Sequence, residues 1–259
     1  MAEAPFTPKA PPADAAAETG LVHVEVEAVR FGGQDVPVGV LRLGRPARAN
    51  AYTPAMLRAL EAGLRRLEGE ARALVVEAEG AGAFCGGADL GLLAAARPED
   101  ALDLLSQRVF SAISTSPLPS VAAVQGPAVA GGCELALACD LRVAGPAARF
   151  ALPETARGLV PAAGGCARLA ALVGGAVARE LILFGRPLSA ERALQLGLIA
   201  ELVDDPRAVA RALAAAAGAR DPLALRLAKD LLRPTDEAAR LQAERHAEAL
   251  LYARAAERR

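Results

Sequence analysis

Two short segments of this chain combine small residues with acids in a way that suits chemistry at a carbonyl group. The first is AFCGGADL at residues 83–90, and the second is QGPAVAGGCELALACD at residues 125–140. The second segment places Glu134 in the first turn of an apolar helix, and Glu154 follows in FALPET. Two backbone donors and two carboxylates around one pocket would suit a reaction that makes and consumes a negatively charged oxygen.

The glycine pair at 131–132 is expected to supply one of these donors. If a helix begins there, its first N–H groups have no partner within the helix and lie at the positive end of the helix dipole. Glycine also lets a ligand approach the backbone closely. The loop at 86–88 is expected to present a second N–H to the same oxygen. Each segment alone is better explained by a plain turn, with Asp89 only capping the next helix. Their shared pattern is what favours a site.

The two acids have a structural explanation and a functional one. An acid among Ala, Leu, Cys and Gly is costly to bury unless it is paired or used, so Glu134 either points to solvent or serves a site. The helix start favours its charged form, whereas desolvation favours the neutral form. Glu154 follows Pro153 and would, alone, be taken for an exposed loop acid. Together, two carboxylates in one pocket could hold a water and divide the general-base and general-acid roles.

Composition excludes several classes of function. The 259 residues are 53% hydrophobic and 23% charged, which favours one large domain, or one domain with an appendage, over global disorder. The net charge is −1 and the basic residues are scattered, so neither nucleic acid nor a membrane is the expected partner. Residues 1–20, rich in Ala and Pro, predict a disordered tail rather than a signal peptide. No apolar run is long enough to span a bilayer.

The four cysteines predict neither a disulfide nor a metal site. Their spacings match no CxxC pattern, and all four sit among Gly, Ala and Leu, where a free cysteine behaves as a small apolar residue. We therefore expect reduced thiols in a cytoplasmic protein. The cysteines are Cys85, Cys133, Cys139 and Cys166.

Hydrophobic periodicity predicts a mixed α/β core followed by a helical C-terminal third. Thr53 is expected to cap a helix that starts at Pro54 and ends near Glu68. Alternation of strands and helices suggests crossover connections. The predicted strands are 21–29, 36–43, 72–78, 119–124, 140–144 and 199–203. The other predicted helices are 98–114, 131–139, 164–175, 176–185, 189–197, 205–218, 221–232 and one from about 235.

The ordered motifs resemble the crotonase superfamily, the enoyl-CoA hydratases and isomerases. The resemblance covers about residues 21–235 and includes the loop GRPARANA, both segments described above and the block FALPETARGLVPAAGGCARL. It implies an α/β fold with a repeated ββα core over 21–195. It also implies a helical region over 196–259 that forms homotrimers, often paired into hexamers. The substrate would be an acyl-CoA, bound without a metal or redox cofactor.

The resemblance also implies a role for each site residue. Ala88 and Gly131 match the positions whose N–H groups hold the thioester oxygen. Glu134 and Glu154 match the two hydratase glutamates. We assign Glu134 to the water that adds at C3 and Glu154 to the proton delivered to C2.

The expected coenzyme A contacts lie in the early loop. Relatives commonly carry a lysine two residues after Asp89, where this chain has Gly91. We therefore expect Arg45, Arg48 and Ala49 to supply these contacts. Further departures are Ala163 where a glycine is usual, Cys166-Ala167 where Thr-Gln is usual, and the closing residues ALLYARAAERR.

Possession of both glutamates favours a 2-enoyl-CoA hydratase. A Δ3–Δ2 enoyl-CoA isomerase, which needs only the acid at Glu154, is the first alternative. A biosynthetic relative acting on acyl groups held by a carrier protein is the second, motivated by Gly91 and the unusual tail. A scaffold or RNA-binding relative is the non-enzymatic alternative, and near-neutral charge together with both acids argues against it. His246 is expected to be a surface residue of the last helix rather than a site residue.

Overall fold

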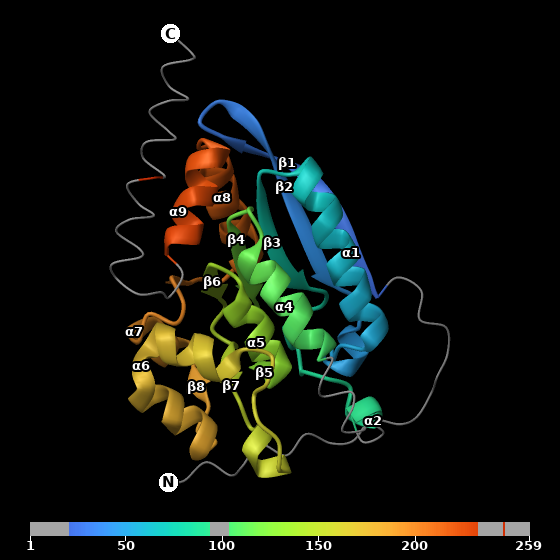
Figure 1. The fold of residues 1–259 in the computed structure, drawn as a ribbon, viewed down its shortest axis with the longest axis vertical. Helices are drawn as coiled ribbons and strands as arrows, with labels where there is room; N and C mark the ends of the chain where they lie inside the picture. Colours follow the sequence, from blue (N-terminus) through green and yellow to red (C-terminus); the bar gives the residue numbers. More distant parts are fainter. Residues whose placement is uncertain (1–20, 94–103, 233–245, 247–259) are drawn as a thin grey trace.

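The main sheet of the fold has six strands (Figure 1). The computed structural model describes residues 21–93, 104–232 and 246. The strands, in their spatial order, are β1 Val22–Phe31, β2 Gln34–Leu43, β3 Ala73–Ala78, β4 Ser120–Val124, β6 Leu141–Ala144 and β9 Glu201–Leu202. β1 and β2 form an antiparallel hairpin, and every other neighbouring pair is parallel. Parallel strands need crossover connections, which agrees with the predicted alternation of strands and helices.

Both faces of the sheet are covered by other elements. Successive side chains of a strand point in opposite directions, so each strand contributes to the packing on both faces. In β3, Leu74 and Val76 belong to one apolar cluster, whereas Ala73 and Val75 belong to the other. A strand buried on both faces reads as a continuous apolar run, which is how β3 was predicted. One cluster contains residues of the helices α1 Pro54–Glu70, α4 Leu105–Thr115 and α5 Gly131–Ala138, and the other contains residues of α8 Pro206–Gly218.

A second, three-stranded sheet carries the segments that hold the predicted site. It is made of β5 Ala128–Val129, β7 Arg149–Ala151 and β8 Leu188–Ser189, in the order β5-β7-β8. β5 leads into α5, and β7 leads into the short 3-10 helix η2, Glu154–Arg157. None of these strands was predicted, because two or three residues are too few to show an alternating pattern. The sheet nevertheless places Glu134 and Glu154 on neighbouring elements.

Helix boundaries agree with the sequence where caps were recognised. Thr53 Oγ1 accepts the N–H of Met56 at 3.2 Å, with Pro54 at the first helical position, as predicted. The two helices predicted over 164–185 form one element, α6 Gly165–Leu183, that is kinked at Gly174. The remaining helices are α2 Leu90–Leu93, η1 Pro46–Arg48, α7 Ala190–Gln195 and α9 Pro222–Leu231.

Some predictions fall outside the described residues. These are the disordered tail over 1–20, the start of the helix predicted from 98, and most of the helix predicted from 235. Within that last helix His246 is described, and it is helical and exposed.

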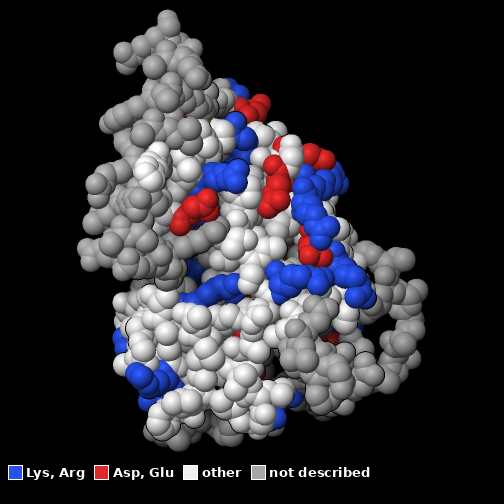
Figure 2. All heavy atoms as spheres, viewed as in Figure 1, with Lys and Arg blue, Asp and Glu red and all other residues white. Residues whose placement is uncertain are grey.

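Charge on the visible surface is mixed. On the face drawn in Figure 2, basic and acidic side chains lie interspersed above a broad uncharged region. Acidic side chains lie among the basic ones over the upper part of this face (Figure 2). Within residues 21–93 and 104–232, no helix combines the length and apolar character that a membrane span requires.

Candidate active site

Tyr52 fixes the direction of the Ala88 N–H group. Its own N–H donates to the Gly87 carbonyl at 2.8 Å, and its carbonyl accepts the N–H of Asp89 at 3.0 Å. In this parallel bridge the two bonds flank Ala88, so the N–H of Ala88 points to the opposite side. No backbone acceptor in the described part of the chain occupies it. The first predicted donor is therefore available to a ligand.

Gly131 begins α5, as the sequence predicted. Its N–H has no acceptor within the helix because the first helical N–H groups lack such partners. Ala130 precedes it with φ 52° and ψ −128°, and the Ala130 N–H donates to the Ala151 carbonyl at 2.8 Å. A positive φ is unfavourable for alanine and costs on the order of 1–3 kcal/mol. The start of α5 is thus held in a strained conformation by its bond to β7.

The two donor segments lie against each other. A Cβ atom added at Gly87 would lie 3.2 Å from the Gly131 nitrogen, and one added at Gly132 would lie 2.0 Å from the Cys85 carbonyl oxygen. Glycine is thus needed for this approach. Ala88 follows Gly87 directly, so the two predicted donors belong to segments that are in contact. Convergence of the two donors on a single thioester oxygen stays a prediction.

We expect Gly132→Ala to separate the two segments. The added methyl group collides with a backbone oxygen rather than with a mobile side chain. Overpacking of this kind costs about 3 kcal/mol of unfolding free energy, measurable by urea denaturation. Gly69→Ala is the matched control, because a Cβ there meets nothing within 4 Å and Gly69 lies in α1. The control should gain about 0.5–1 kcal/mol. Equal stability of the two variants would contradict the described contact.

Glu134 is anchored by one carboxylate oxygen and left open at the other. Its Oε1 accepts the N–H groups of Ala163 at 2.7 Å and Gly165 at 2.8 Å, and the residue is 4% exposed. Oε2 accepts no hydrogen bond from the residues that the structure describes. Burial raises the pKa of Glu134, while the two N–H donors and the charge of Arg168 act to lower it. Burial outweighs these effects, so the pKa of Glu134 lies above its ordinary value, and the carboxyl group is fixed through one oxygen while the other is free.

Glu154 is buried, and the backbone N–H that acts on its carboxyl group is its own rather than one from another segment. It starts η2, is 9% exposed, and its Oε2 has no hydrogen-bond partner in the described part of the chain. Burial raises the pKa of Glu154 to about 7, and the charge of Glu134 adds to this rise. An ionised carboxylate in such surroundings is poorly stabilised, so the neutral acid persists to higher pH than usual. The two predicted acids therefore interact, and their environments differ.

The Tyr52 side chain lies against the start of α5. A Cβ added at Gly131 would lie 2.1 Å from the Tyr52 hydroxyl oxygen, and the ring packs edge-on against Phe110 with centroids 5.7 Å apart. Burial raises the pKa of Tyr52, as do the charges of Glu134 and Glu154. Sequence reasoning missed Tyr52, because it stands in an irregular loop. The only signal was a large aromatic in a chain with 3% aromatic residues.

Asn50 connects the early loop to the first donor segment, and it too was missed. Its Nδ2 donates to the carbonyls of Glu79 at 3.1 Å and Ala83 at 2.9 Å, and its Oδ1 accepts the Arg45 N–H at 2.9 Å. The residue is 1% exposed and has φ 51°, a conformation that asparagine tolerates better than most residues. An asparagine in a loop bounded by proline and a helix cap was the available signal.

The predicted coenzyme A contacts, Arg45, Arg48 and Ala49, lie in this same loop. The Arg45 guanidinium donates to the Ala51 carbonyl at 2.8 Å and pairs with Asp89 at 3.1 Å, and its side chain is 14% exposed. The Ala49 carbonyl accepts the N–H of Gly86 at 2.9 Å. These contacts give Arg45 and Ala49 a structural role in holding the first donor segment. Binding of coenzyme A by the loop stays a prediction.

The cysteines are free in the structure. Cys85, Cys133 and Cys139 are buried, as expected of small apolar residues, but Cys166 is exposed. The expectation that Cys166 packs as an apolar residue is wrong, because the second position of α6 turns its side chain outward. No cluster of three potential metal ligands occurs among the described residues.

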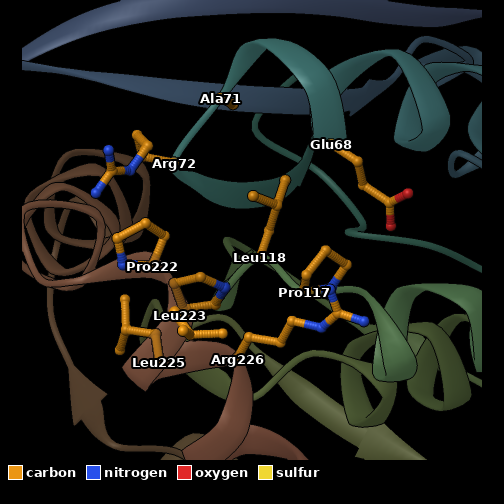
Figure 3. Close-up of a pocket in the computed structure, with 10 residues that line it drawn as sticks. Glu68, Ala71, Arg72, Pro117, Leu118, Pro222, Leu223, Leu225 and Arg226 are labelled. Carbon is orange, nitrogen blue, oxygen red and sulfur yellow. The ribbon is translucent and has the colours of Figure 1, made fainter. Parts of the chain in front are cut away.

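A pocket of about 360 Å³ lies away from these residues, between the end of α1, the loop before β4 and the start of α9 (Figure 3). Its lining includes Arg72, Leu118 and Arg226. α1 has 17 residues, so its two ends are roughly 25 Å apart, and Tyr52 lies at the other end. None of the predicted site residues lines this pocket.

Comparison with known proteins identifies the family of this chain. The profile of the enoyl-CoA hydratase/isomerase family matches residues 34–258. The putative enoyl-CoA hydratase/isomerase YngF of Bacillus subtilis is 37% identical over 209 residues, which is 78% of this chain and 80% of that protein. The 2,3-dehydroadipyl-CoA hydratase of Escherichia coli is 36% identical over 206 residues, covering 77% and 80%. The crystal structure of enoyl-CoA hydratase from Bacillus anthracis superposes with a TM-score of 0.80 at 31% identity, covering 87% of this chain and 89% of that one.

Proposed function

Because this chain belongs to the enoyl-CoA hydratase/isomerase family, we propose that it adds water across the C2=C3 bond of a 2-enoyl-CoA thioester. The observation that carries this proposal is the difference between two interacting acids. Glu134 is held by two N–H donors of a distant segment and keeps one oxygen free, whereas Glu154 has only its own backbone N–H beside it and a pKa raised to about 7. One group suits a base and the other an acid.

In the proposed reaction the thioester oxygen accepts the N–H groups of Ala88 and Gly131. The free oxygen of Glu134 takes a proton from a water whose oxygen bonds to C3. The C2=C3 electrons move toward the thioester, and the resulting enolate is stabilised by the two donors. Removing one such donor typically costs about 3 kcal/mol of transition-state stabilisation. Glu154 then gives its proton to C2, and a proton must pass from Glu134 to Glu154, through solvent, before the next turnover.

The proposal predicts that hydratase activity declines above neutral pH. Glu154 must be protonated to act, and its raised pKa keeps it protonated up to about pH 7. Activity is therefore present below this pH and falls above it, by about tenfold per unit in kcat/KM. Hydration of crotonyl-CoA, followed as loss of ultraviolet absorbance between pH 5 and 9, measures this. A rate that stays level up to pH 9 would show that Glu154 is not the proton donor.

A Δ3–Δ2 isomerase is the second candidate, and one observation favours it. A single acid with a pKa raised to about 7 can both accept and donate a proton, so Glu154 alone could move a proton along the acyl chain. Double-bond migration in a 3-enoyl-CoA, without hydration of crotonyl-CoA, would favour the isomerase. A biosynthetic relative is distinguished from both by comparing turnover of the same acyl group on coenzyme A and on a carrier protein. Faster turnover on the carrier protein would favour the biosynthetic relative.

We also propose a homotrimer, or a pair of trimers, in a reducing cytoplasm. Val160, Leu183 and Phe184 are 66%, 62% and 77% exposed, and such apolar surface is typical of an interface between subunits. Four unpaired thiols suit a reducing compartment. Light scattering of the purified chain tests the oligomer, and a monomer at micromolar concentration would contradict it.

A further inference from the structure

One guanidinium group holds the turn that binds Glu134. Arg168, in the first turns of α6, donates through Nη1 to the Ala163 carbonyl at 2.8 Å and through Nη2 to the Ser111 hydroxyl at 3.2 Å. A Cβ added at Gly164 would lie 2.1 Å from Nη1, so the guanidinium packs directly on the turn. Gly164 has φ 103°, a conformation that favours glycine. Arg168 therefore fixes residues 163–165 from one side.

Glu134 holds the same turn from the other side. The N–H of Ala163 donates to Glu134, while the carbonyl of Ala163 accepts from Arg168. Hydrogen bonds linked in this way polarise and strengthen one another. The Arg168 charge acts to lower the pKa of Glu134, against the effect of burial. Burial in turn lowers the pKa of Arg168, and the charge of Glu134 opposes this effect.

Among the described residues, Arg168 is the cation whose charge acts to lower the pKa of Glu134. Arg108, on the neighbouring helix α4, pairs with Glu61 at 3.4 Å. The other titratable groups whose charges interact with Glu134 are Tyr52, Cys133, Glu154 and Cys166. None of these becomes positive, so none of them can replace the effect of Arg168.

We propose that Arg168 is a positioning residue for the reaction. It fixes the carboxylate of Glu134 through the 163–165 turn, so that the free Oε2 faces the reacting water, and its charge favours the ionised form. The inference rests on the proposed function. Arginine suits this role better than lysine, because its planar fork donates in two directions while its charge stays fixed.

Two substitutions separate the effect of the positive charge of Arg168 from that of its forked guanidinium hydrogen-bond donors. Arg168→Lys keeps the charge and loses the fork, whereas Arg168→Gln loses the charge and keeps one donor. A nearby opposite charge typically lowers a carboxyl pKa by about one unit or more. We therefore expect Arg168→Gln to move the acid limb of kcat/KM upward by up to about one pH unit, and the loss of positioning to lower kcat about tenfold. KM should change less than about threefold. Arg168→Lys should move the acid limb much less while still lowering kcat.

Arg179→Gln is the matched control. Arg179 lies on the same helix and is exposed, so this exchange should leave the acid limb in place. If the acid limb of kcat/KM in Arg168→Gln coincides with that of the unsubstituted protein, the proposal is overturned. The proposal is also overturned if Arg168→Lys shifts the acid limb of kcat/KM as far as Arg168→Gln does.

A second readout separates this inference from the proposed function. Carbon-13 NMR of labelled glutamate side chains follows the Glu134 carboxyl directly, and Glu134→Gln identifies its signal. An upward shift of this titration in Arg168→Gln supports the positioning role even where no preparation hydrates crotonyl-CoA, in which case only the proposed function fails. An unchanged titration in an active hydratase removes the role of Arg168 and leaves the hydratase proposal in place.

Discussion

Glu134→Gln is expected to lower kcat for crotonyl-CoA hydration by about a thousandfold, because general-base catalysis contributes about 10²–10⁴ in rate. The amide has nearly the shape of the carboxylate, and its oxygen can still accept the N–H groups of Ala163 and Gly165. What is lost is the ability to take a proton from water. Circular dichroism and the thermal midpoint should therefore stay close to those of the unsubstituted protein.

Glu201→Gln provides the control for the Glu134 exchange. Glu201 is an exposed residue of β9, so the same change of charge there should leave kcat unaltered. A Glu134→Gln protein that is folded and retains more than a tenth of the activity would show that another group activates the water. Isomerisation of a 3-enoyl-CoA gives a further contrast, because a proton shuttle through Glu154 alone would survive the loss of Glu134.

Glu154→Gln is expected to lower kcat by about 10²–10⁴-fold, since the proton donor to C2 is removed. Its second expected effect is on the pH profile. The fall in rate above about pH 7 arises from ionisation of Glu154, so the residual activity of the variant should lack it. Burying a neutral amide in place of an acid that is itself mostly neutral at low pH should change the stability little there.

Two results would contradict this role of Glu154. A residual activity that still falls near pH 7 would assign that limb to another group. Hydration that survives in Glu154→Gln while it disappears in Glu134→Gln would mean that water or a neighbouring side chain protonates C2. Loss of hydration in both Glu154→Gln and Glu134→Gln is the pattern that we expect of a hydratase.

The larger elements could be predicted from the sequence because their signals are local. The ten-residue strands β1 and β2 show alternation, β3 shows an apolar run, and Thr53 with Pro54 marks the start of α1. The beginning of α5 at Gly131 was predicted from its glycine pair. These features depend on residues within one or two turns of each other, which is the range over which sequence patterns are informative.

The supporting residues could not be predicted because their contacts join distant parts of the chain. Arg168 reaches Ser111, and Asn50 reaches Ala83. Tyr52 orders the Ala88 segment through backbone bonds that any residue type could make. The short strands β5 and β7, which bring Glu134 and Glu154 near each other, exist through pairing across the fold rather than through local propensity.

The central claim is that the N–H groups of Ala88 and Gly131 meet at one thioester oxygen, with Glu134 and Glu154 beside the adjacent carbons. A crystal structure of the Glu134→Gln protein with crotonyl-CoA measures this most directly. We predict that the thioester oxygen lies about 2.7–3.1 Å from both nitrogens, with position 134 nearest C3 and Glu154 nearest C2. A thioester oxygen bound by other groups, or acids that face away from C2 and C3, would contradict it.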